Sequence, residues 1–241
     1  MNTVTLKDRV DQNETAARAN RQAFDAAGVT VFTLIGPAGS GKTSLIETLL
    51  LRLAPPARCA FILANQAADR QISRITRHGY PAVAIKTDSI SAVQVQDAVK
   101  RLDLSQLDLL FIEADGNGLN SQSSNVGHHF RIGVFSAAGG DDKVNEFPSL
   151  VAGADLLLLT KIDLLPFVKF DLKVFADDIA RIKRTLPTLQ LSAQSGVGLD
   201  KVLDWVRTHG EARRAPRKEN GDRALIQSCS TKRREESRGD P

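Results

Sequence analysis

Apolar residues fall in short continuous runs along most of the chain, and stretches with helical spacing separate these runs. Runs rich in Val, Ile and Leu that do not alternate with polar residues are typical of strands covered on both faces of a parallel sheet. We expect seven such strands, at residues 29–35, 60–64, 82–86, 107–113, 131–137, 154–160 and 189–193.

The stretches between these runs predict helices, which we expect at 42–53, 66–78, 91–102, 171–186 and 199–208. The first ends before Pro55-Pro56, and Gly79 follows the second in the position that commonly ends a helix. An alanine-rich stretch at 13–27 predicts a further helix on the sheet edge. Strands that alternate with helices indicate a doubly wound α/β fold with a mostly parallel seven-stranded sheet.

The length of 241 residues fits one large domain and a tail. We expect a helical segment over 1–28, an α/β domain over 29–210 and a disordered basic tail over 211–241. The tail has nine Lys or Arg, six Asp or Glu and almost no apolar periodicity, and it accounts for +3 of the net charge of +4. The remaining body is therefore nearly neutral, and we expect no nucleic-acid partner.

The composition is ordinary for a globular protein, with 42% hydrophobic and 25% charged residues. Two cysteines, Cys59 and Cys229, are too few for a disulfide scaffold. No apolar run reaches about 18 residues, and the first twenty residues hold no apolar signal region. We therefore expect a cytoplasmic protein without a membrane span.

The segment GPAGSGKT at residues 36–43 matches the phosphate-binding pattern G-x-x-x-x-G-K-[ST] between a predicted strand and a predicted helix. Its glycines let successive backbone N–H groups face one concavity, which suits a phosphate at a helix N-terminus. Lys42 is expected to reach the β- and γ-phosphates, and the Thr43 hydroxyl to ligate Mg²⁺. The expected triphosphate contacts of this segment and of the residue after it are Gly36, Gly39, Ser40, Gly41, Lys42, Thr43 and Ser44.

The tetrapeptide TKID at 160–163 is similar to the N-K-x-D guanine motif of GTPases. The Asp163 carboxylate can accept two hydrogen bonds from guanine, whereas adenine offers no matching pair of donors. Lys161 would lie along the base plane, and Thr160 replaces the usual Asn. Ser192 and Ala193 begin SAQSG, which resembles the loop whose Ala193 N–H would meet guanine O6. Together the motifs favour GTP over ATP.

Glu113 ends a predicted strand and begins the sequence EADG. NTPases place the acid on the Mg²⁺ side of the site after such a strand. We therefore expect Glu113 to act with Lys42 and Thr43 in catalysis, and Thr43 and Glu113 to hold Mg²⁺. Asp115 is the alternative for this acid, and an ordinary strand-end carboxylate is the alternative role for Glu113.

Five segments resemble the HypB/UreG family of SIMIBI-class GTPases, between about residue 13 and residue 207. They are NETAARANRQAFDAAGV, FIEADGN, GHHFRIGVFSAAGGDDK, ADLLLLTKIDLLPFVKFD and LSAQSGVGLDKVLDWV. The resemblance implies a SIMIBI-like P-loop G domain that hydrolyses GTP slowly to GDP and forms a nucleotide-dependent homodimer. It also implies a metallochaperone or a client metalloenzyme precursor as partner, in the maturation of a hydrogenase-type nickel centre.

The chain departs from that family at the positions of its metal ligands. The family carries a Cys-His pair after the third strand, where residues 86–94 read KTDSISAVQ, and a further Cys near the position of Asn120. A tight Ni²⁺ or Zn²⁺ site needs thiolate or imidazole donors. We therefore expect no Ni²⁺ or Zn²⁺ site, with Cys59 in the core and Cys229 in the tail.

Two further positions bear on the mechanism. The family's switch acid after the second strand is replaced by Asn65, with Asp69 nearby as a possible substitute. His128 and His129 match a family His-His pair outside the metal ligands. Adjacent residues of an extended chain point in opposite directions, so we expect a surface or interface role for this pair rather than a shared metal.

The sequence thus predicts a slow GTPase that acts as a nucleotide-gated accessory protein in metalloenzyme maturation. Two alternatives stay open. One is a degenerate regulator or scaffold that binds GTP and barely hydrolyses it, which Asn65 favours. The other is a G-protein chaperone of a different metallocofactor enzyme, such as the partners of cobalamin-dependent mutases.

Overall fold

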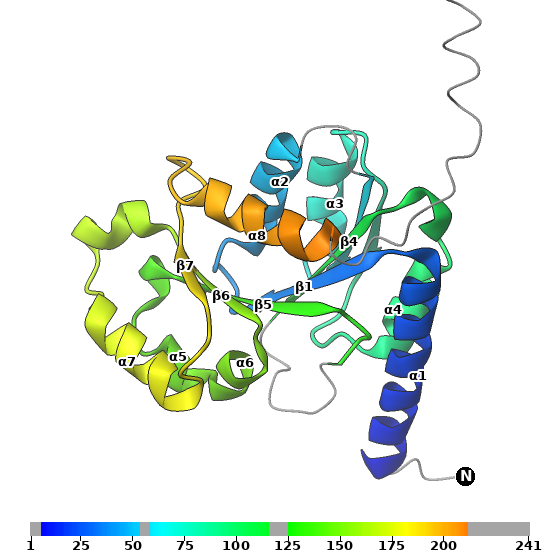
Figure 1. Cartoon of the computed structure of the whole chain (residues 1–241), viewed down its shortest axis with the longest axis horizontal. Helices are drawn as coiled ribbons and strands as arrows, with labels where there is room; N and C mark the ends of the chain where they lie inside the picture. Colours follow the sequence, from blue (N-terminus) through cyan, green and yellow to red (C-terminus); the bar gives the residue numbers. More distant parts are fainter. Residues whose placement is uncertain (1–5, 54–57, 116–124, 212–241) are drawn as a thin grey trace, which may run out of the picture.

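A single sheet of seven parallel strands forms the centre of the protein (Figure 1). The computed structural model describes residues 6–53, 58–115 and 125–211. The strands are β1 (Thr30–Gly36), β2 (Cys59–Ala64), β3 (Ala82–Ile85), β4 (Leu109–Asp115), β5 (Phe130–Ser136), β6 (Leu156–Thr160) and β7 (Thr188–Gln190). They lie in the order β3-β2-β4-β1-β5-β6-β7, and every neighbouring pair is parallel. The predicted doubly wound α/β fold is confirmed.

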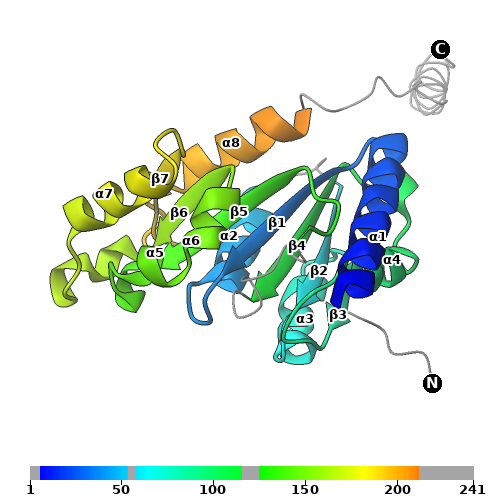
Figure 2. The ribbon, with the colours of Figure 1, turned by 90° about the horizontal axis from the view of Figure 1, so that it is seen from below.

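Helices cover both faces of the sheet (Figure 2). They are α1 (Leu6–Ala27), α2 (Lys42–Arg52), α3 (Ala68–Thr76), α4 (Ala92–Val99), α5 (Lys143–Glu146), α6 (Pro148–Gly153), α7 (Leu172–Ile182) and α8 (Leu199–Glu211). Among the described residues, short 3-10 helices join them at η1 (Leu104–Gln106), η4 (Ala137–Gly139) and η5 (Ile162–Phe167). Buried residues of α2, α3 and α8 pack on one face, and those of α1, α4, α5, α6 and α7 on the other.

The central strands are apolar on both sides, as the continuous runs predict. On β1, Phe32 and Leu34 belong to the core on the side of α2, α3 and α8, whereas Val31 and Ile35 belong to the core on the opposite side. The ring of Phe32 stacks between Phe111 and Phe130, at 5.5 Å from each ring centre. Such close aromatic contacts across three adjacent strands add to the burial that holds the sheet together.

The structure differs from the predicted elements mainly at helix ends. Helix α3 begins at Ala68 rather than at residue 66, because the Asn65 side chain accepts the Ala67 N–H and holds a turn before the helix. Helix α7 ends at Ile182, four residues before the predicted end. Helices α5 and α6 were not predicted, because four and six residues show too little periodicity to be recognised.

Helix α1 lies along α4 at one side of the sheet (Figures 1 and 2). Asn13 Oδ1 accepts the Ala92 N–H, and Asn20 Nδ2 donates to the carbonyls of Ala92 and Val126. We call the polar contacts of Asn13, Asn20, Arg21 and Asp25 with Ala92 and residues 125–129 the α1 seam. Two of its asparagines are buried, and both bond to backbone groups.

A surface or interface role was expected for the His128-His129 pair, and the surface alternative is wrong for His129. Its side chain is 1% exposed, its Nδ1 accepts the Val31 N–H, and its Nε2 lies 2.9 Å from Asp25 Oδ1. The His128 carbonyl accepts a hydrogen bond from Arg21. The segment before β5 runs beneath the end of α1, and this position buries the second histidine against the start of β1.

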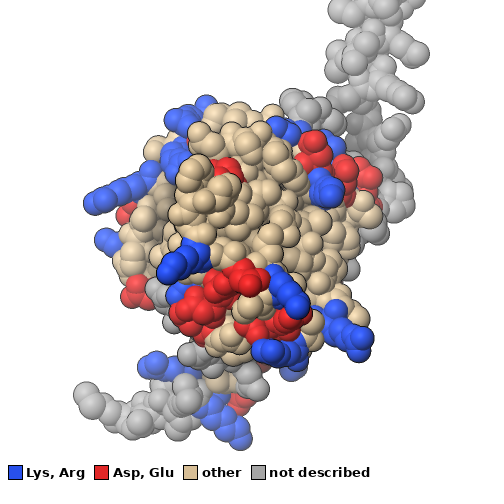
Figure 3. Space-filling model, turned by 90° about the vertical axis from the view of Figure 1, so that its left-hand side faces the viewer, with Lys and Arg blue, Asp and Glu red and all other residues tan. Residues whose placement is uncertain are grey.

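The side of the molecule that carries α7 has a mixed charge (Figure 3). Acidic side chains gather there with basic side chains around them, and a broad uncharged area adjoins them. Within the described ranges, no helix is long and apolar enough to cross a membrane.

Candidate functional site

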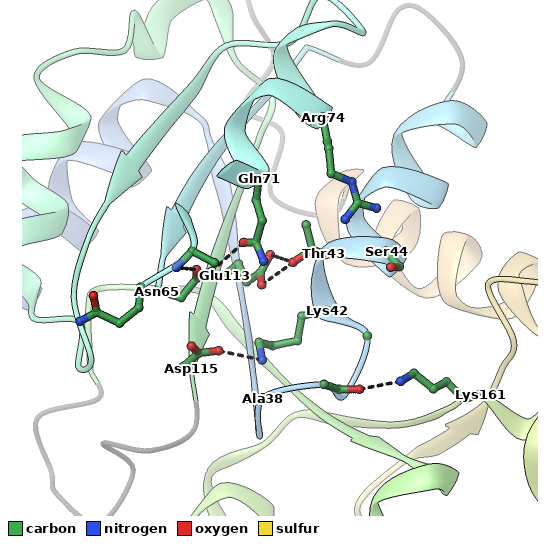
Figure 4. Close-up of a pocket in the computed structure, with 14 residues that line it drawn as sticks. Ala38, Lys42, Thr43, Ser44, Asn65, Gln71, Arg74, Glu113, Asp115 and Lys161 are labelled. Atoms are coloured by element: carbon green, nitrogen blue, oxygen red, sulfur yellow. Dashed lines mark hydrogen bonds and ion pairs between the residues drawn. The ribbon is translucent and has the colours of Figure 1, made fainter. Parts of the chain in front are cut away.

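The predicted phosphate-binding segment forms the loop between β1 and α2 (Figure 4). Gly39 and Gly41 adopt φ values of 77° and 87°, a region that residues with a side chain rarely enter. A Cβ on Gly36 would lie 2.1 Å from the Val134 carbonyl oxygen of the neighbouring strand. The glycines of the motif are therefore required by the loop conformation and by close packing against β5.

Lys42 is a buried charge at the first position of α2, with only 4% of its surface exposed. Its Nζ donates to the carbonyls of Gly36 and Pro37 at 2.9 and 3.1 Å, and it lies 3.1 Å from Asp115 Oδ1. A buried ammonium group is stable only with such partners. Two loop carbonyls and the Asp115 carboxylate thus hold the Lys42 ammonium against its own loop.

Glu113 and Thr43 form the second polar contact of the site. The Thr43 hydroxyl lies 2.7 and 2.9 Å from the two carboxylate oxygens of Glu113, whose exposure is 2%. Burial raises the pKa of Glu113, and the Thr43 hydrogen bond and the charge of Lys42 offset this only in part. Because burial still disfavours the ionised carboxylate of Glu113, a cation bound beside it would stabilise the charge.

A cavity of about 390 Å³ opens in front of these groups, where β1, β2 and β4 end (Figure 4). This is where parallel α/β sheets bind ligands. Its lining comprises Ala38, Gly39, Gly41, Lys42, Thr43, Ser44, Asn65, Gln66, Ala67, Gln71, Arg74, Glu113, Asp115 and Lys161. A second cavity of about 200 Å³ lies on the other side of the loop, between residues 37–40 and the segment from Phe135 to Lys143.

The segment TKID is bound directly to the phosphate-binding loop. The Thr160 hydroxyl donates to the Ser40 carbonyl at 2.6 Å, and Lys161 Nζ donates to the Gly39 carbonyl at 2.8 Å. Lys161 has φ 57°, the one positive φ of a described non-glycine residue. Such a conformation is rare outside glycine and often marks a functional site. Thr160, in place of the usual Asn, therefore still contacts the loop.

The two predicted guanine segments lie next to each other. Strands β6 and β7 pair, and the Ile162 N–H donates to the Leu191 carbonyl. Asp163, Ser192 and Ala193, however, do not line either cavity. Asp163 lies in η5, and the buried Ser192 hydroxyl accepts the Ser195 N–H. Their roles as guanine contacts stay predictions.

Residues after β2 and on α3 line a side of the cavity that no sequence motif indicates. Asn65 is buried at the end of β2, and its Nδ2 donates to Gln71 Oε1 at 2.9 Å. Gln71 and Arg74 lie three positions apart on α3, and Asp69, the possible substitute acid, is exposed and outside the lining. Helical spacing in the segment after the second strand is the one signal that could have indicated Gln71 and Arg74.

The positions that match the family's metal ligands show no metal cluster in the part of the chain that the structure describes. No group of three His, Cys, Asp or Glu side chains gathers there, and Asp88 accepts a hydrogen bond from Gln66. Burial raises the pKa of Cys59 to about 12, so it is a thiol in the core. Asn120 and Cys229 lie outside the described residues, and the expected lack of a Ni²⁺ or Zn²⁺ site stays a prediction.

Comparison with known proteins identifies relatives along most of the chain. Residues 30–190 match the family described as CobW/HypB/UreG, nucleotide-binding domain. Hydrogenase maturation factor HypB of Escherichia coli is 34% identical over 83% of this chain and 70% of its own length. The probable HypB of Methanocaldococcus jannaschii is 35% identical over 83% of this chain and 92% of its own length.

A solved structure agrees with these sequence matches. The crystal structure of HypB from Archaeoglobus fulgidus superposes with a TM-score of 0.77 at 27% identity, and covers 83% of this chain and 99% of that one. The matched range 30–190 contains the phosphate-binding loop, Glu113 and TKID. The chain therefore belongs to the CobW/HypB/UreG family of nucleotide-binding domains, and within it is similar to the HypB hydrogenase maturation factors.

Proposed function

We propose that this protein binds GTP and hydrolyses it slowly to GDP and phosphate. The observation that carries the proposal is the arrangement around the larger cavity. Buried Lys42 and buried Glu113 enter it from adjacent elements, and each is held by a partner of the same site, Asp115 and Thr43. Lys42 and the loop N–H groups would bind the β- and γ-phosphates, with Gly36, Gly39, Ser40, Gly41 and Ser44 forming the concavity.

The residues present fit Mg²⁺. The Thr43 hydroxyl and the Glu113 carboxylate are hard oxygen donors, and the burial that raises the pKa of Glu113 is relieved by a cation. These two residues would hold the ion, which would neutralise charge on the β- and γ-phosphate oxygens. Asp115, paired with Lys42, keeps that lysine in place at the rim of the same cavity.

Guanine is the base that the remaining polar groups favour. Lys161 is anchored on the Gly39 carbonyl, and its neighbour Asp163 follows it in η5. We propose that Asp163 accepts from the guanine N1–H and amine, while the Ala193 N–H reaches O6. The second cavity, which Lys161 also lines, adjoins the loop on this side.

We infer a role as a nucleotide-gated accessory protein in the maturation of a hydrogenase-type nickel centre. The support is the 34% and 35% identity to HypB proteins named hydrogenase maturation factors. The partner would be a metallochaperone or a client metalloenzyme precursor in the cytoplasm. Because Asp88, Ser89 and Asn120 stand where the family has metal ligands, the partner rather than this chain would hold nickel.

Binding and single-turnover measurements test the proposal. We expect micromolar GTP affinity with Mg²⁺, clear preference over ATP, and slow release of one phosphate per site. Equal affinity for ATP, or no nucleotide binding at all, would contradict it. Equilibrium dialysis of the reduced, tag-free protein tests the nickel part, where a stoichiometric sub-micromolar Ni²⁺ or Zn²⁺ site would overturn it.

A nucleotide-dependent homodimer belongs to the same proposal. The segment Gly139–Lys143 matches the family closely, and both of these residues line the second cavity beside the loop. A ligand that binds the dimer better than the monomer shifts the protein toward the dimer. Light scattering at micromolar concentration should show a doubled mass with Mg²⁺ and a non-hydrolysable GTP analogue, and a strict monomer would count against it.

One observation favours the second candidate, a GTP-gated regulator that barely hydrolyses. Asn65 stands where the family has its switch acid, and its amide bonds to another amide, that of Gln71. No carboxylate of β2 or α3 therefore lines the cavity. Wild-type protein that binds GTP tightly and releases no phosphate in a single turnover would establish this candidate instead.

A further inference from the structure

Helix α3 brings two polar side chains into the larger cavity from the side opposite the phosphate-binding loop (Figure 4). Gln71 and Arg74 are three residues apart, so they project from the same face of the helix. Both side chains extend from α3 toward the start of α2 (Figure 4). Neither belongs to a nucleotide-binding motif, and the phosphate contacts proposed above use neither of them.

The amide of Gln71 is held in one orientation. Its Oε1 accepts from Asn65 Nδ2 at 2.9 Å, and Asn65 is itself fixed because its Oδ1 accepts the Ala67 N–H at 2.8 Å. Gln71 Nε2 has no hydrogen-bond partner among the described residues, although it lines the cavity. A carbonyl oxygen has two lone pairs, so Oε1 can accept one further bond. Gln71 can therefore both donate to and accept from a small polar molecule in the cavity.

An ion pair with Glu47 holds the guanidinium of Arg74 in place. Glu47 on α2 pairs with Arg74 through one carboxylate oxygen and with Arg77 through the other. Burial acts to raise the pKa of Glu47, but the hydrogen bonds and charges of the two arginines outweigh it, and that pKa lies below its ordinary value. Glu47 therefore stays ionised and fixes Arg74, while the remaining N–H groups of Arg74 are free to bind a phosphate oxygen.

The carboxylates of the cavity are already engaged. Glu113 accepts from Thr43, and Asp115 pairs with Lys42. The side-chain amides of Asn65 and Gln71 are neutral and cannot act as a general base. Phosphoryl transfer needs a positioned water and neutralised oxygens more than a strong base, and other GTPases position the water with a Gln and add an Arg.

We propose that Gln71 and Arg74 form the hydrolytic half of the site, an inference that rests on the proposed GTPase function. Gln71, held by Asn65, orients the attacking water, and Arg74, held by Glu47, neutralises charge on the γ-phosphate. The water oxygen bonds to the γ-phosphorus as the bond to the β,γ-bridging oxygen breaks, and GDP leaves with that electron pair. The water protons pass to the phosphate oxygens and to solvent, so no side chain takes part as a base.

Single-turnover hydrolysis of GTP with Mg²⁺ by the full chain tests this inference. We expect Gln71→Ala to slow phosphate release at least tenfold and Arg74→Ala about a hundredfold, with GTP affinity of the Gln71 variant within threefold of wild type. Arg74→Lys should recover part of the rate, because it keeps the charge and loses the planar fork.

Arg77→Ala is the matched control for Arg74. Arg77 pairs with the same Glu47, but it is more exposed, at 61% against 40% for Arg74, and does not line the cavity. Arg70→Ala, at an exposed neighbouring position, is the control for Gln71. Both should hydrolyse at the wild-type rate, with circular dichroism and thermal unfolding confirming that every variant folds.

Affinity for GDP with aluminium fluoride separates positioning from a structural role. This complex imitates the transition state, so the Gln71→Ala and Arg74→Ala variants should lose affinity for it while GTP binding persists.

Wild-type rates in Gln71→Ala and Arg74→Ala would overturn the inference and leave the GTPase proposal intact. So would a loss of GTP affinity as large as the loss of rate. A wild-type protein that binds GTP without releasing phosphate would overturn the inference and leave GTP binding intact, whereas no GTP binding would fail the proposed function itself.

Discussion

The larger cavity, here called the phosphate cavity, and the α1 seam are both rich in buried polar groups. They differ in whether those groups bond to the protein backbone or face an open space. In the α1 seam, Asn13 and Asn20 bond to backbone groups of α4 and of the segment before β5. In the cavity, Glu113 and Gln71 keep bonding capacity on the side that faces an open space of about 390 Å³. The charge of Lys42 borders the same space, while its ammonium bonds to the carbonyls of Gly36 and Pro37 and to Asp115.

This difference teaches that buried polarity alone does not mark a functional site. Burial of a polar group is tolerated when the group is hydrogen-bonded, whichever purpose it serves. The α1 seam uses its bonds to attach a long helix to the sheet, and the cavity holds charges ready for a ligand. The comparison therefore predicts changes in stability at one region and changes in binding at the other.

The largest effect that separates the two regions is expected from Lys42→Ala. It removes a charge-assisted contact to phosphate, which should weaken GTP binding by about 3 kcal/mol, or more than a hundredfold. Asp115 loses its partner but is partly exposed and can be hydrated. Isothermal titration measures the affinity, and Lys100→Ala, which removes an exposed lysine on α4's C-terminal side, is the control. Unchanged GTP affinity would contradict the phosphate-binding assignment.

The next effect is expected in the α1 seam. Asn20 is 3% exposed, and Asn20→Ala leaves the carbonyls of Ala92 and Val126 without this donor. Stability in urea should fall by about 2–3 kcal/mol, with GTP affinity of the folded protein unchanged. Gln22→Ala, an exposed position on the same helix, should change stability by less than about 0.5 kcal/mol. A large loss of GTP affinity in Asn20→Ala would break the distinction between the regions.

His128, at the edge of the α1 seam, should make stability depend on pH. Burial lowers its pKa from 6.5 to about 4, with the charges of Arg131 and Arg21 acting in the same direction. Between these pH values the unfolded chain binds a proton that the folded chain does not, so stability is complete above pH 6.5 and falls as the pH drops toward 4. From pH 7 to pH 5 we expect a loss of about 2 kcal/mol.

Urea unfolding at several pH values measures this loss, and His128→Gln isolates the contribution of one histidine. The variant should lack the part of the pH dependence that His128 supplies. An identical pH dependence in wild type and variant would contradict the assignment of the acid-sensitive group.

The same comparison shows what could be predicted from the sequence. Most strands were predictable because they are continuous apolar runs, whereas the short edge strand β7 reads TLQ and carries little such signal. The loop between β1 and α2 was predictable because its glycines and Lys42 follow a pattern that the phosphate chemistry requires. Contacts between distant segments were less predictable. The burial of His129 depends on how the end of α1 lies over the start of β1, and no local spacing encodes that placement.

The cavity shows the same limit on its α3 side. Glu113 was predictable because it lies near the carboxyl end of a strand, although β4 continues two residues further, to Asp115. Gln71 and Arg74 instead reach the cavity only through the angle at which α3 packs on β2 and β3. Thr160 stands in place of the usual Asn, and its hydroxyl donates to the Ser40 carbonyl. A polar side chain can replace another when geometry, rather than residue type, makes the bond.

The smallest effect, expected from Asp163→Asn, decides whether the guanine segments belong with the cavity. Asp163 lines neither cavity, yet TKID is bonded to the phosphate-binding loop through Thr160 and Lys161. If Asp163 binds guanine, the variant loses a charged acceptor and GTP affinity falls by about 1.5 kcal/mol, roughly tenfold. Xanthosine triphosphate should gain in relative affinity, because its C2 carbonyl can accept from the new amide. Competition between the two nucleotides measures the ratio, with Asp177→Asn on α7 as the control. An unchanged ratio would place base recognition elsewhere and confine the functional region to the phosphate cavity.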